Sequence, residues 1–291
     1  MTPLPFSRRL VSSLTTLVLV VLAGGFFAAA LVRYSPGFDS IAEDLNPGMS
    51  PATLRALHER RSRENRLPIF YARYLSGAIQ GDFGISQNLK QPVTELLRQR
   101  APVTARLILL GTAGGWMLGG LLAWVAAWMR RPALEAGASS ISGFLLAIPP
   151  AVLGLAFFFY QAPLELALSL ALLPRLFGTM RALLEDCWSS PALLAARSRG
   201  VGPITIAARY VLWATAPQLM ALLGLAFVLA FGFAIPIEAL CDVPGIGALA
   251  LQAATSRDMP LLCGMALIVT FFVTFVHAAG DLATSLAGKR A

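Results

Sequence analysis

The stretch from Glu185 to Pro217, EDCWSSPALLAARSRGVGPITIAARYVLWATAP, is the one long interruption in the apolar second half of the chain. Ser190 can cap a helix N-terminus, and Pro191 suits the first helical position, where no N–H partner is needed. Gly200 suits the left-handed conformation that ends a helix. The spacing predicts a helix of about nine residues, roughly 13 Å long. Because so short a helix is not stable alone in water, we expect it to dock on another structure.

The composition of the whole chain is that of a protein embedded in a membrane. The chain has 291 residues, of which 57% are hydrophobic and 13% charged, and its mean hydropathy is +0.70. Soluble domains carry about 25% charged residues, so we expect an integral membrane protein. The formal net charge of +8 could indicate a nucleic-acid partner. In so apolar a chain, basic residues that flank the spans explain it better, and we expect no nucleic acid.

Six apolar runs are long enough to cross a bilayer, which takes about 20 residues. They lie at about 10–32, 103–128, 139–160, 164–184, 214–236 and 261–282. A cleaved signal peptide is the alternative interpretation of the first run, but its apolar region would normally be only about 7–15 residues. The sequence therefore predicts an all-α, polytopic membrane protein with about six transmembrane helices.

Charges in the connecting segments predict how the spans are oriented and how the chain is divided. Basic residues gather at the two ends, at 130–131 and at 181–209, whereas the loops at 161–165 and 237–260 are acidic or nearly neutral. The positive-inside rule then places the N- and C-termini in the cytoplasm. The predicted domains are an N-terminal transmembrane helix (1–33), an extracytoplasmic helical segment (34–102) and a five-helix transmembrane core (103–291) with a cytoplasmic loop at 185–210.

Glycine and proline residues within the spans predict how the helices pack. Gly111, Gly115 and Gly119 recur every four residues, which leaves one helix face almost without side chains and lets another helix approach closely. Pro149 and Pro150 predict a kink in the third span. The backbone groups that they free must be satisfied by neighbours or by a water-lined cavity, and a plain packing kink is the alternative.

Arg175, His277 and Asp281 are ionisable residues within the predicted spans. A charge at the depth of Arg175 costs about 2.5–3.5 kcal/mol on insertion scales, so this side chain should face protein or water, or extend to the cytoplasmic side. His277 and Asp281 lie one helical turn apart. They could form a proton relay or a metal pair, and a structural hydrogen bond is the favoured alternative.

Few residues suggest catalysis or a bound cofactor. Glu238 and Asp242 could be a catalytic carboxylate pair, but no histidine is near them in the sequence. The three cysteines are far apart and include no CxxC pair, so they predict neither a metal site nor a disulfide framework. The stretch GTAGGWMLGG at 111–120 lacks the Lys-Ser/Thr of a phosphate-binding loop. We expect no cofactor, no metal and no catalytic residue, and any ATP must be handled by another chain.

In this loop, Leu194-Ala195-Ala196 are followed after three more residues by Gly200. This pattern resembles the EAA signature of inner-membrane permeases of ATP-binding-cassette (ABC) importers, with Leu194 where the signature usually has Glu. In that family the loop holds the coupling helix, which sits in a groove of the cytoplasmic ATPase. The resemblance implies ATPase coupling through Leu193, Leu194, Ala195, Ala196, Arg197, Arg199 and Gly200.

Further motifs resemble the dipeptide, oligopeptide and nickel branch of these permeases. They are Tyr-Leu-Ser-Gly at 74–77, Gly-Asp-Phe-Gly-Ile-Ser at 81–86, and a Pro-x4-Gly pattern formed by Pro149 and Gly154. Strings at 244–247 and 256–260 are similar to the outer loop near the gate. The resemblance implies an outer gate at Glu238, Pro244, Gly245, Gly247 and Asp258. It also implies possible pathway residues at Pro149, Gly154 and Arg175.

The resemblance implies a translocation subunit rather than an enzyme. It would lie among the lipids of a bacterial-type inner membrane and pair with a second permease as a heterodimer. Two cytoplasmic ATP-binding subunits and an extracytoplasmic solute-binding protein would complete the importer, and its solute could be a peptide, a nickel complex, an opine or a sugar. The alternative is an ion-coupled secondary transporter that uses Arg175, His277 and Asp281. A third possibility is an intramembrane hydrolase that uses Glu238 and Asp242.

Overall fold

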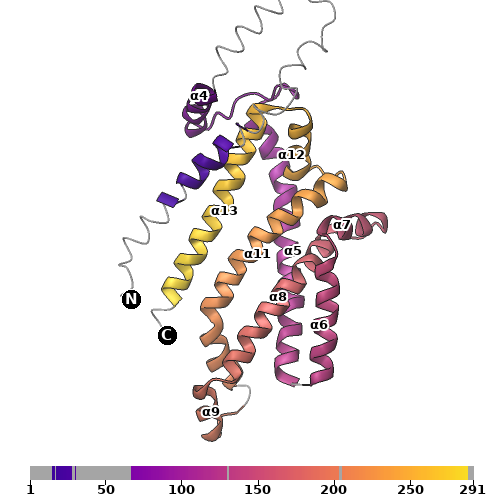
Figure 1. The fold of residues 1–291 in the computed structure, drawn as a ribbon, viewed down its shortest axis with the longest axis vertical. Coiled ribbons are helices and arrows are strands. Elements are labelled where there is room, and N and C mark those ends of the chain that lie inside the picture. Colours follow the sequence, from indigo (N-terminus) through magenta and orange to yellow (C-terminus); the bar gives the residue numbers. More distant parts are fainter. Residues whose placement is uncertain are drawn as a thin grey trace, which may run out of the picture. The chain divides into compact units, whose positions relative to one another are not determined.

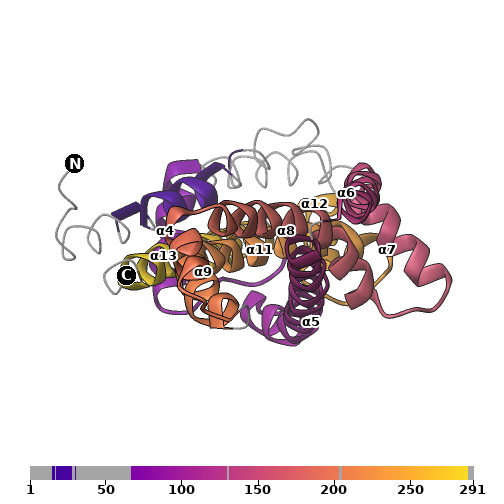
Figure 2. The same ribbon diagram turned by 90° about the horizontal axis from the view of Figure 1, so that it is seen from below.

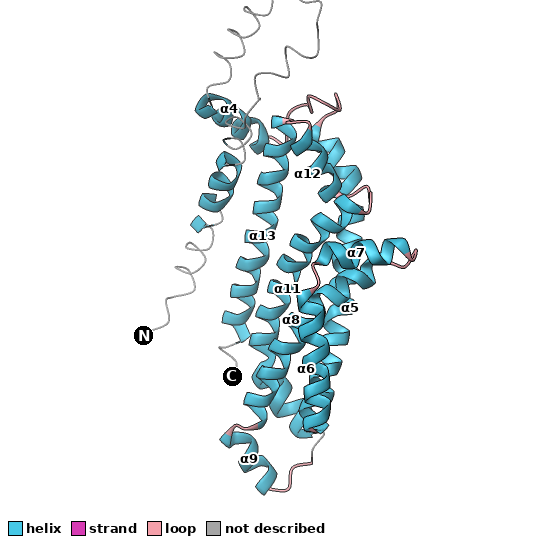
Figure 3. Cartoon of the chain, turned by 45° about the vertical axis from the view of Figure 1, so that its right-hand side comes forward, coloured by secondary structure: helices cyan, strands magenta, loops and turns pink. Residues whose placement is uncertain are grey.

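Helices make up nearly all of the described chain. The computed structural model describes residues 15–16, 18–27, 30, 67–129, 131–202 and 205–287. Within these ranges there is no strand, only an isolated antiparallel bridge between Ile85 and Pro92 (Figure 3). The predicted extracytoplasmic segment is described only from Leu67 onward, and its first part lies outside the described residues.

Four helices are long and apolar enough to cross a membrane: α5 (Val93–Met129), α8 (Leu164–Trp188), α11 (Leu212–Leu240) and α13 (Met259–Ala287). The bent pair α6 (Pro132–Ala147) and α7 (Pro150–Phe159) makes a possible fifth span. The first predicted span is described only in part, as an apolar helix over Val18–Phe27. The prediction of an all-α polytopic membrane protein is confirmed, with four or five spans in the described residues against the predicted six.

Shorter helices connect these spans. They are α4 (Leu67–Ile79), α9 (Pro191–Ser198), the π-helix η1 (Ile206–Val211) and α12 (Ile246–Thr255). The chain divides into two compact units, residues 1–101 with 249–274 and residues 102–248 with 275–291. The boundaries between the units fall within α5, α12 and α13, and each unit is described by itself below.

The third predicted span is broken rather than kinked. Helix α6 ends at Ala147, Ile148 and Pro149 have extended backbone conformations, and α7 begins at Pro150. The two helices are bent by 91°, which Figure 1 shows as a sharp turn from α6 into α7. Each of the two extended residues precedes a proline, and a residue before proline is disfavoured in the α region. The bend is therefore at the predicted place but is a full break rather than a kink, because two such restrictions follow one another directly.

In the second unit, the glycine face of α5 lies against a leucine face of α8. Figures 1 and 2 show the two helices next to each other. A Cβ placed on Gly111 would lie 2.5 Å from a methyl carbon of Leu168, and one on Gly115 would lie 3.1 Å from Leu172 Cβ. One on Gly119 would lie 3.2 Å from a backbone nitrogen of α8. Such close approach is possible only because these residues lack side chains, and it lets the Ser169 hydroxyl of α8 donate to Gly111 O of α5 at 3.0 Å.

In the first unit, two tyrosines anchor α4. Tyr71 and Tyr74 form a buried cluster with Cys263 and Leu267 of α13. The Tyr71 hydroxyl donates to the backbone oxygen of Leu22 at 2.6 Å, and the Tyr74 hydroxyl donates to that of Pro260 at 3.0 Å. Burial raises the pKa of both phenols, and the nearby Cys263 raises it further. Each ring therefore packs in the core while its hydroxyl finds a partner.

Candidate functional site

The predicted short helix is present as α9, from Pro191 to Ser198. Pro191 occupies its first turn, and Ser190 holds the N-cap position with an extended backbone. The Ser190 hydroxyl makes no capping hydrogen bond, however. The proposed side-chain cap is therefore absent, and the backbone oxygen of Ser190 accepts from Leu193 N at 3.1 Å instead.

Gly200 ends α9 in a left-handed conformation, with a φ of +75°. Its N–H donates to Arg197 O at 2.9 Å, and Val201 N donates to Ala196 O at 3.3 Å. These two bonds form a Schellman motif, which satisfies the last carbonyls of the helix. No heavy atom lies within 4 Å of where a Cβ on Gly200 would be. Only the backbone conformation favours glycine here, and a side chain would cost roughly 1–2 kcal/mol.

The inner face of α9 packs on its own chain. Leu193 and Ala196 are 2% and 4% exposed. The Arg197 guanidinium lies over the Trp188 ring, 4.9 Å from its centroid. Trp188 also packs edge-to-face against Trp128 of α5, with ring centroids 6.0 Å apart. The end of α5, the end of α8 and α9 are thus joined through one buried tryptophan.

This packing changes which predicted coupling residues are available to a partner. Leu193 and Ala196 face their own chain, so they cannot supply the contact surface. Ser198, Arg199 and Gly200 are exposed. The side chain of Leu194 lies outside the described part of the chain. Among the described side chains, the accessible ones at the end of α9 include Arg197, Ser198 and Arg199.

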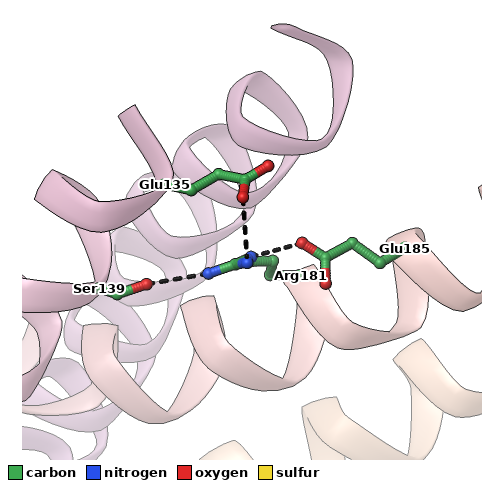
Figure 4. Close-up of polar contacts among 4 residues, drawn as sticks. All are labelled: Glu135, Ser139, Arg181 and Glu185. Carbon is green, nitrogen blue, oxygen red and sulfur yellow. Dashed lines mark hydrogen bonds and ion pairs between the residues drawn. The ribbon is translucent and has the colours of Figure 1, made fainter. Parts of the chain in front are cut away.

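A polar cluster that the sequence interpretation missed lies on α6 and α8 (Figure 4). Arg181 Nε bonds Glu185 Oε1 at 2.5 Å, one turn along α8. Its Nη1 donates to Ser139 Oγ at 2.9 Å, and its Nη2 lies 3.5 Å from Glu135 Oε2. The two α6 residues are four apart in sequence, as are the two α8 residues. This double spacing was the available signal, but only the folded structure shows that the two faces meet.

Four of the predicted outer-loop residues lie together at the start of α12. Glu238 is fully buried, and its Oε2 accepts from Gly247 N at 2.7 Å. Thr104 Oγ1 accepts from Ile246 N at 2.8 Å, so these two side chains cap the helix. A Cβ on Gly245 would collide with the Glu238 carboxyl, and one on Gly247 would lie 2.6 Å from a backbone carbon of α11. Pro244, beside them in the chain, is exposed.

Asp258, the fifth predicted outer-loop residue, belongs to the other unit. Its side chain is 1% exposed. Oδ2 accepts from Ser86 Oγ at 2.5 Å and from Asn88 N at 3.0 Å. Oδ1 accepts from Leu261 N at 3.2 Å, near the start of α13. Asp258 therefore caps a helix and fixes the loop that contains the Gly-Asp-Phe-Gly-Ile-Ser motif.

The remaining predicted residues are distributed along the second unit. Gly154 of α7 is buried, and a Cβ on it would lie 3.0 Å from Ile237 of α11. Pro149, Arg175 and His277 are exposed. The side chain of Asp281 lies outside the described residues, so its pairing with His277 stays a prediction.

The geometry of Glu238 bears on the hydrolase interpretation. Its carboxylate is buried and occupied with capping α12, whereas Asp242 is exposed with a φ of +51°. The pair does not have the arrangement of two carboxylates that share one buried site.

Long apolar helices, a broken helix pair and a short docked loop helix define a multi-pass α-helical membrane protein. The family model for the inner membrane component of binding-protein-dependent transport systems matches residues 119–291, which include both α9 and the outer loop. The chain belongs to this family, whose members are the permease subunits of ABC importers.

Named relatives extend the match over nearly the whole chain. A probable peptide ABC transporter permease protein of Sinorhizobium fredii, y4tP, is 22% identical over 309 residues, covering 97% of each chain. A Brucella abortus protein named as a peptide transport system permease is 24% identical over 297 residues, covering 93% of this chain and 94% of its own. The nickel import system permease protein NikB of Staphylococcus aureus is 24% identical over 295 residues, covering 96% and 90%. These names support the peptide and nickel branch.

Proposed function

We propose that this chain is one of two transmembrane subunits of an ATP-driven importer for di- or oligopeptides, or for a related small solute. It would form half of the translocation pathway, and a second, different permease would form the other half. The peptide and nickel names of its relatives support this solute class. Membership of the importer family favours this function over an ion-coupled secondary transporter.

The observation that carries the proposal is the way α9 is held. Its inner face is fixed by buried Leu193 and by Trp188, and its end is set by the left-handed Gly200. A helix of eight residues contributes little stability of its own, so this bracing gives it a defined orientation. The exposed side, with Ser198 and Arg199, would seat in a groove of a cytoplasmic ATP-binding subunit. Closure of two such subunits around ATP would then move α9 and open the pathway.

The opposite side of the membrane would receive a solute-binding protein. Glu238 and Asp258 cap the starts of α12 and α13, and we assign these two residues to the outer gate. Buried caps of this kind hold helix starts in place, which suits a gate that closes to one geometry. The exposed Pro149 at the helix break and the exposed Arg175 are assigned to the pathway, where water or solute would satisfy their polar groups. Both termini would be cytoplasmic.

Transport by the complete complex in proteoliposomes tests this function. The chain is reconstituted with its second permease, both ATP-binding subunits and the binding protein, and uptake of a labelled peptide bound by that protein is followed. Uptake should require enclosed ATP and loaded binding protein, and an uncoupler should not reduce it. Uptake that an ion gradient drives without ATP would contradict the proposal.

A further inference from the structure

We propose that Arg181 is a positioning residue that carries movement of α9 to α6. The inference rests on the proposed coupling role of α9 and extends it to a specific connection inside the membrane subunit. Arg181 would make α6 follow the end of α8, so that the broken helix pair α6–α7 responds when the ATP-binding subunits move α9.

The first step is the contact between α9 and α8. Only Ser189 and Ser190 separate the two helices in the chain. Trp188, in the last turn of α8, is 7% exposed, and the Arg197 guanidinium of α9 lies over its ring. The same Trp188 ring also packs against Trp128, near the end of α5. A displacement of α9 is therefore passed to the end of α8 rather than absorbed by a flexible linker.

The second step is the contact between α8 and α6. Arg181 lies two helical turns before Trp188, and its guanidinium bonds three side chains, as Figure 4 shows. Glu185 holds the guanidinium on α8, and Glu135 and Ser139 attach it to α6. Because guanidinium is planar with donors in a fixed fork, it connects the two helices in one geometry. A lysine ammonium is a compact charge and does not reproduce this fork.

The third step is that α6 has few other restraints. Its next polar contact with α8 is long, 3.4 Å from Ser142 Oγ to Pro174 O. A Cβ on Gly137 or Gly143 would meet no atom within 4 Å. Phe144 is 69% exposed within the chain. Helix α6 is thus packed along one side, and Arg181 is its strongest polar attachment among the described residues.

The far end of α6 explains what this attachment would accomplish. After the 91° break, Gly154 of α7 packs closely on Ile237 of α11, next to the buried Glu238. Movement of α6 would therefore reach the part of α11 that caps the outer loop. The ordinary alternative is that Arg181 only stabilises the fold, as many ion pairs do weakly.

The experiment measures peptide imported per ATP hydrolysed by the full reconstituted complex. Arg181→Ala and Glu135→Gln should each lower this ratio several-fold, while the amount of assembled complex and the stimulation of ATP hydrolysis by loaded binding protein are retained. Arg181→Lys should not restore the ratio. The exchange Glu135→Arg with Arg181→Glu should restore it in part, because the new arginine faces two carboxylates. Asp186→Asn is the matched control, since Asp186 is an exposed carboxylate beside Glu185.

An unchanged ratio in Arg181→Ala and Glu135→Gln would overturn the inference. A ratio that stays normal while assembled complex is lost would overturn it as well, since that is the signature of a purely structural role. Gly200→Val separates this inference from the proposed function. If Gly200→Val abolishes stimulation and the Arg181 variants transport normally, the inference about Arg181 fails alone. If Gly200→Val leaves the stimulation of ATP hydrolysis unchanged, the proposed coupling role of α9 is contradicted, and the inference about Arg181 that rests on it is contradicted too.

Discussion

Arg197 of α9 lies over the ring of Trp188 of α8, with its guanidinium carbon 4.9 Å from the ring centroid. This contact joins the short loop helix to the end of a membrane span across only two intervening residues. Cation–π contacts at exposed sites contribute about 0.5–1 kcal/mol, and the Trp188 ring that makes this contact is itself 7% exposed.

Trp188→Ala should therefore release α9 from the end of α8. Removing a buried tryptophan typically costs about 3–5 kcal/mol, and here it also removes the contact with Trp128. The measurement is limited trypsin digestion of the purified complex, with cleavage after Arg197 and Arg199 followed over time. Cleavage should be faster in Trp188→Ala. Trp213→Ala is the control, because Trp213 is 69% exposed within the chain. Equal cleavage rates in both variants would show that Trp188 does not hold α9.

Gly115→Leu should separate α5 from α8. A Cβ on Gly115 already lies 3.1 Å from Leu172 Cβ and 3.3 Å from a backbone oxygen of α8. Overpacking costs about 1–3 kcal/mol or more, so assembled permease should fall and its Tm should drop. Leu118→Ala, at a side chain 41% exposed, should be mild. Thermal unfolding in detergent distinguishes the two variants, and equal Tm values would mean that the glycine face is not a packing face.

The buried tyrosines predict an alkaline limit to stability. Burial raises the pKa of Tyr71 and Tyr74 in the folded protein, so folding favours the neutral phenols. Their contribution is fully present below the ordinary tyrosine pKa of about 10 and is lost as the pH rises through the folded value. Tyrosinate absorbance should show two groups that ionise above the ordinary tyrosine pKa, and Tyr74→Phe should remove one of them. Ionisation of all tyrosines near the ordinary pKa would contradict this packing.

Orientation in the membrane can be tested with an impermeant thiol reagent. In a variant without the native cysteines, Asp242→Cys should label in intact cells, and Arg131→Cys should label only after the cells are opened. Both positions are exposed in the structure. The expectation follows from the basic residues near α9 and the acidic outer loop. Labelling of position 131 alone in intact cells would invert the topology.

The sequence predicted those features that depend on local chemistry. Apolar runs predicted the long helices, and the Ser190-Pro191 and Gly200 signals predicted α9 to within a residue. The left-handed φ of Gly200 follows from the same local rule. The break after α6 was underestimated, although the pair of pre-proline positions at Ile148 and Pro149 contained the information.

Features that depend on tertiary proximity could not be predicted. The sequence did not indicate that Arg181 contacts α6, because its partners on that helix lie more than forty residues away in the chain. The burial of Leu193 arises where α9 packs on its own chain, and its neighbours in the sequence did not indicate it. Glu238 and Asp258 were predicted to belong to one outer loop. In the structure the two carboxylates cap different helices in different units.

The most direct test of the account is ATP hydrolysis by the reconstituted complex in response to loaded binding protein, measured for Gly200→Val. This substitution touches no apolar span, and a Cβ at this position would have no heavy atom within 4 Å, so the chain should insert normally. It strains the left-handed position by roughly 1–2 kcal/mol and should misdirect α9. We predict loss of most of the stimulation, with assembled permease present at normal levels. Full stimulation in Gly200→Val would show that α9 is only a connector and would contradict the coupling mechanism.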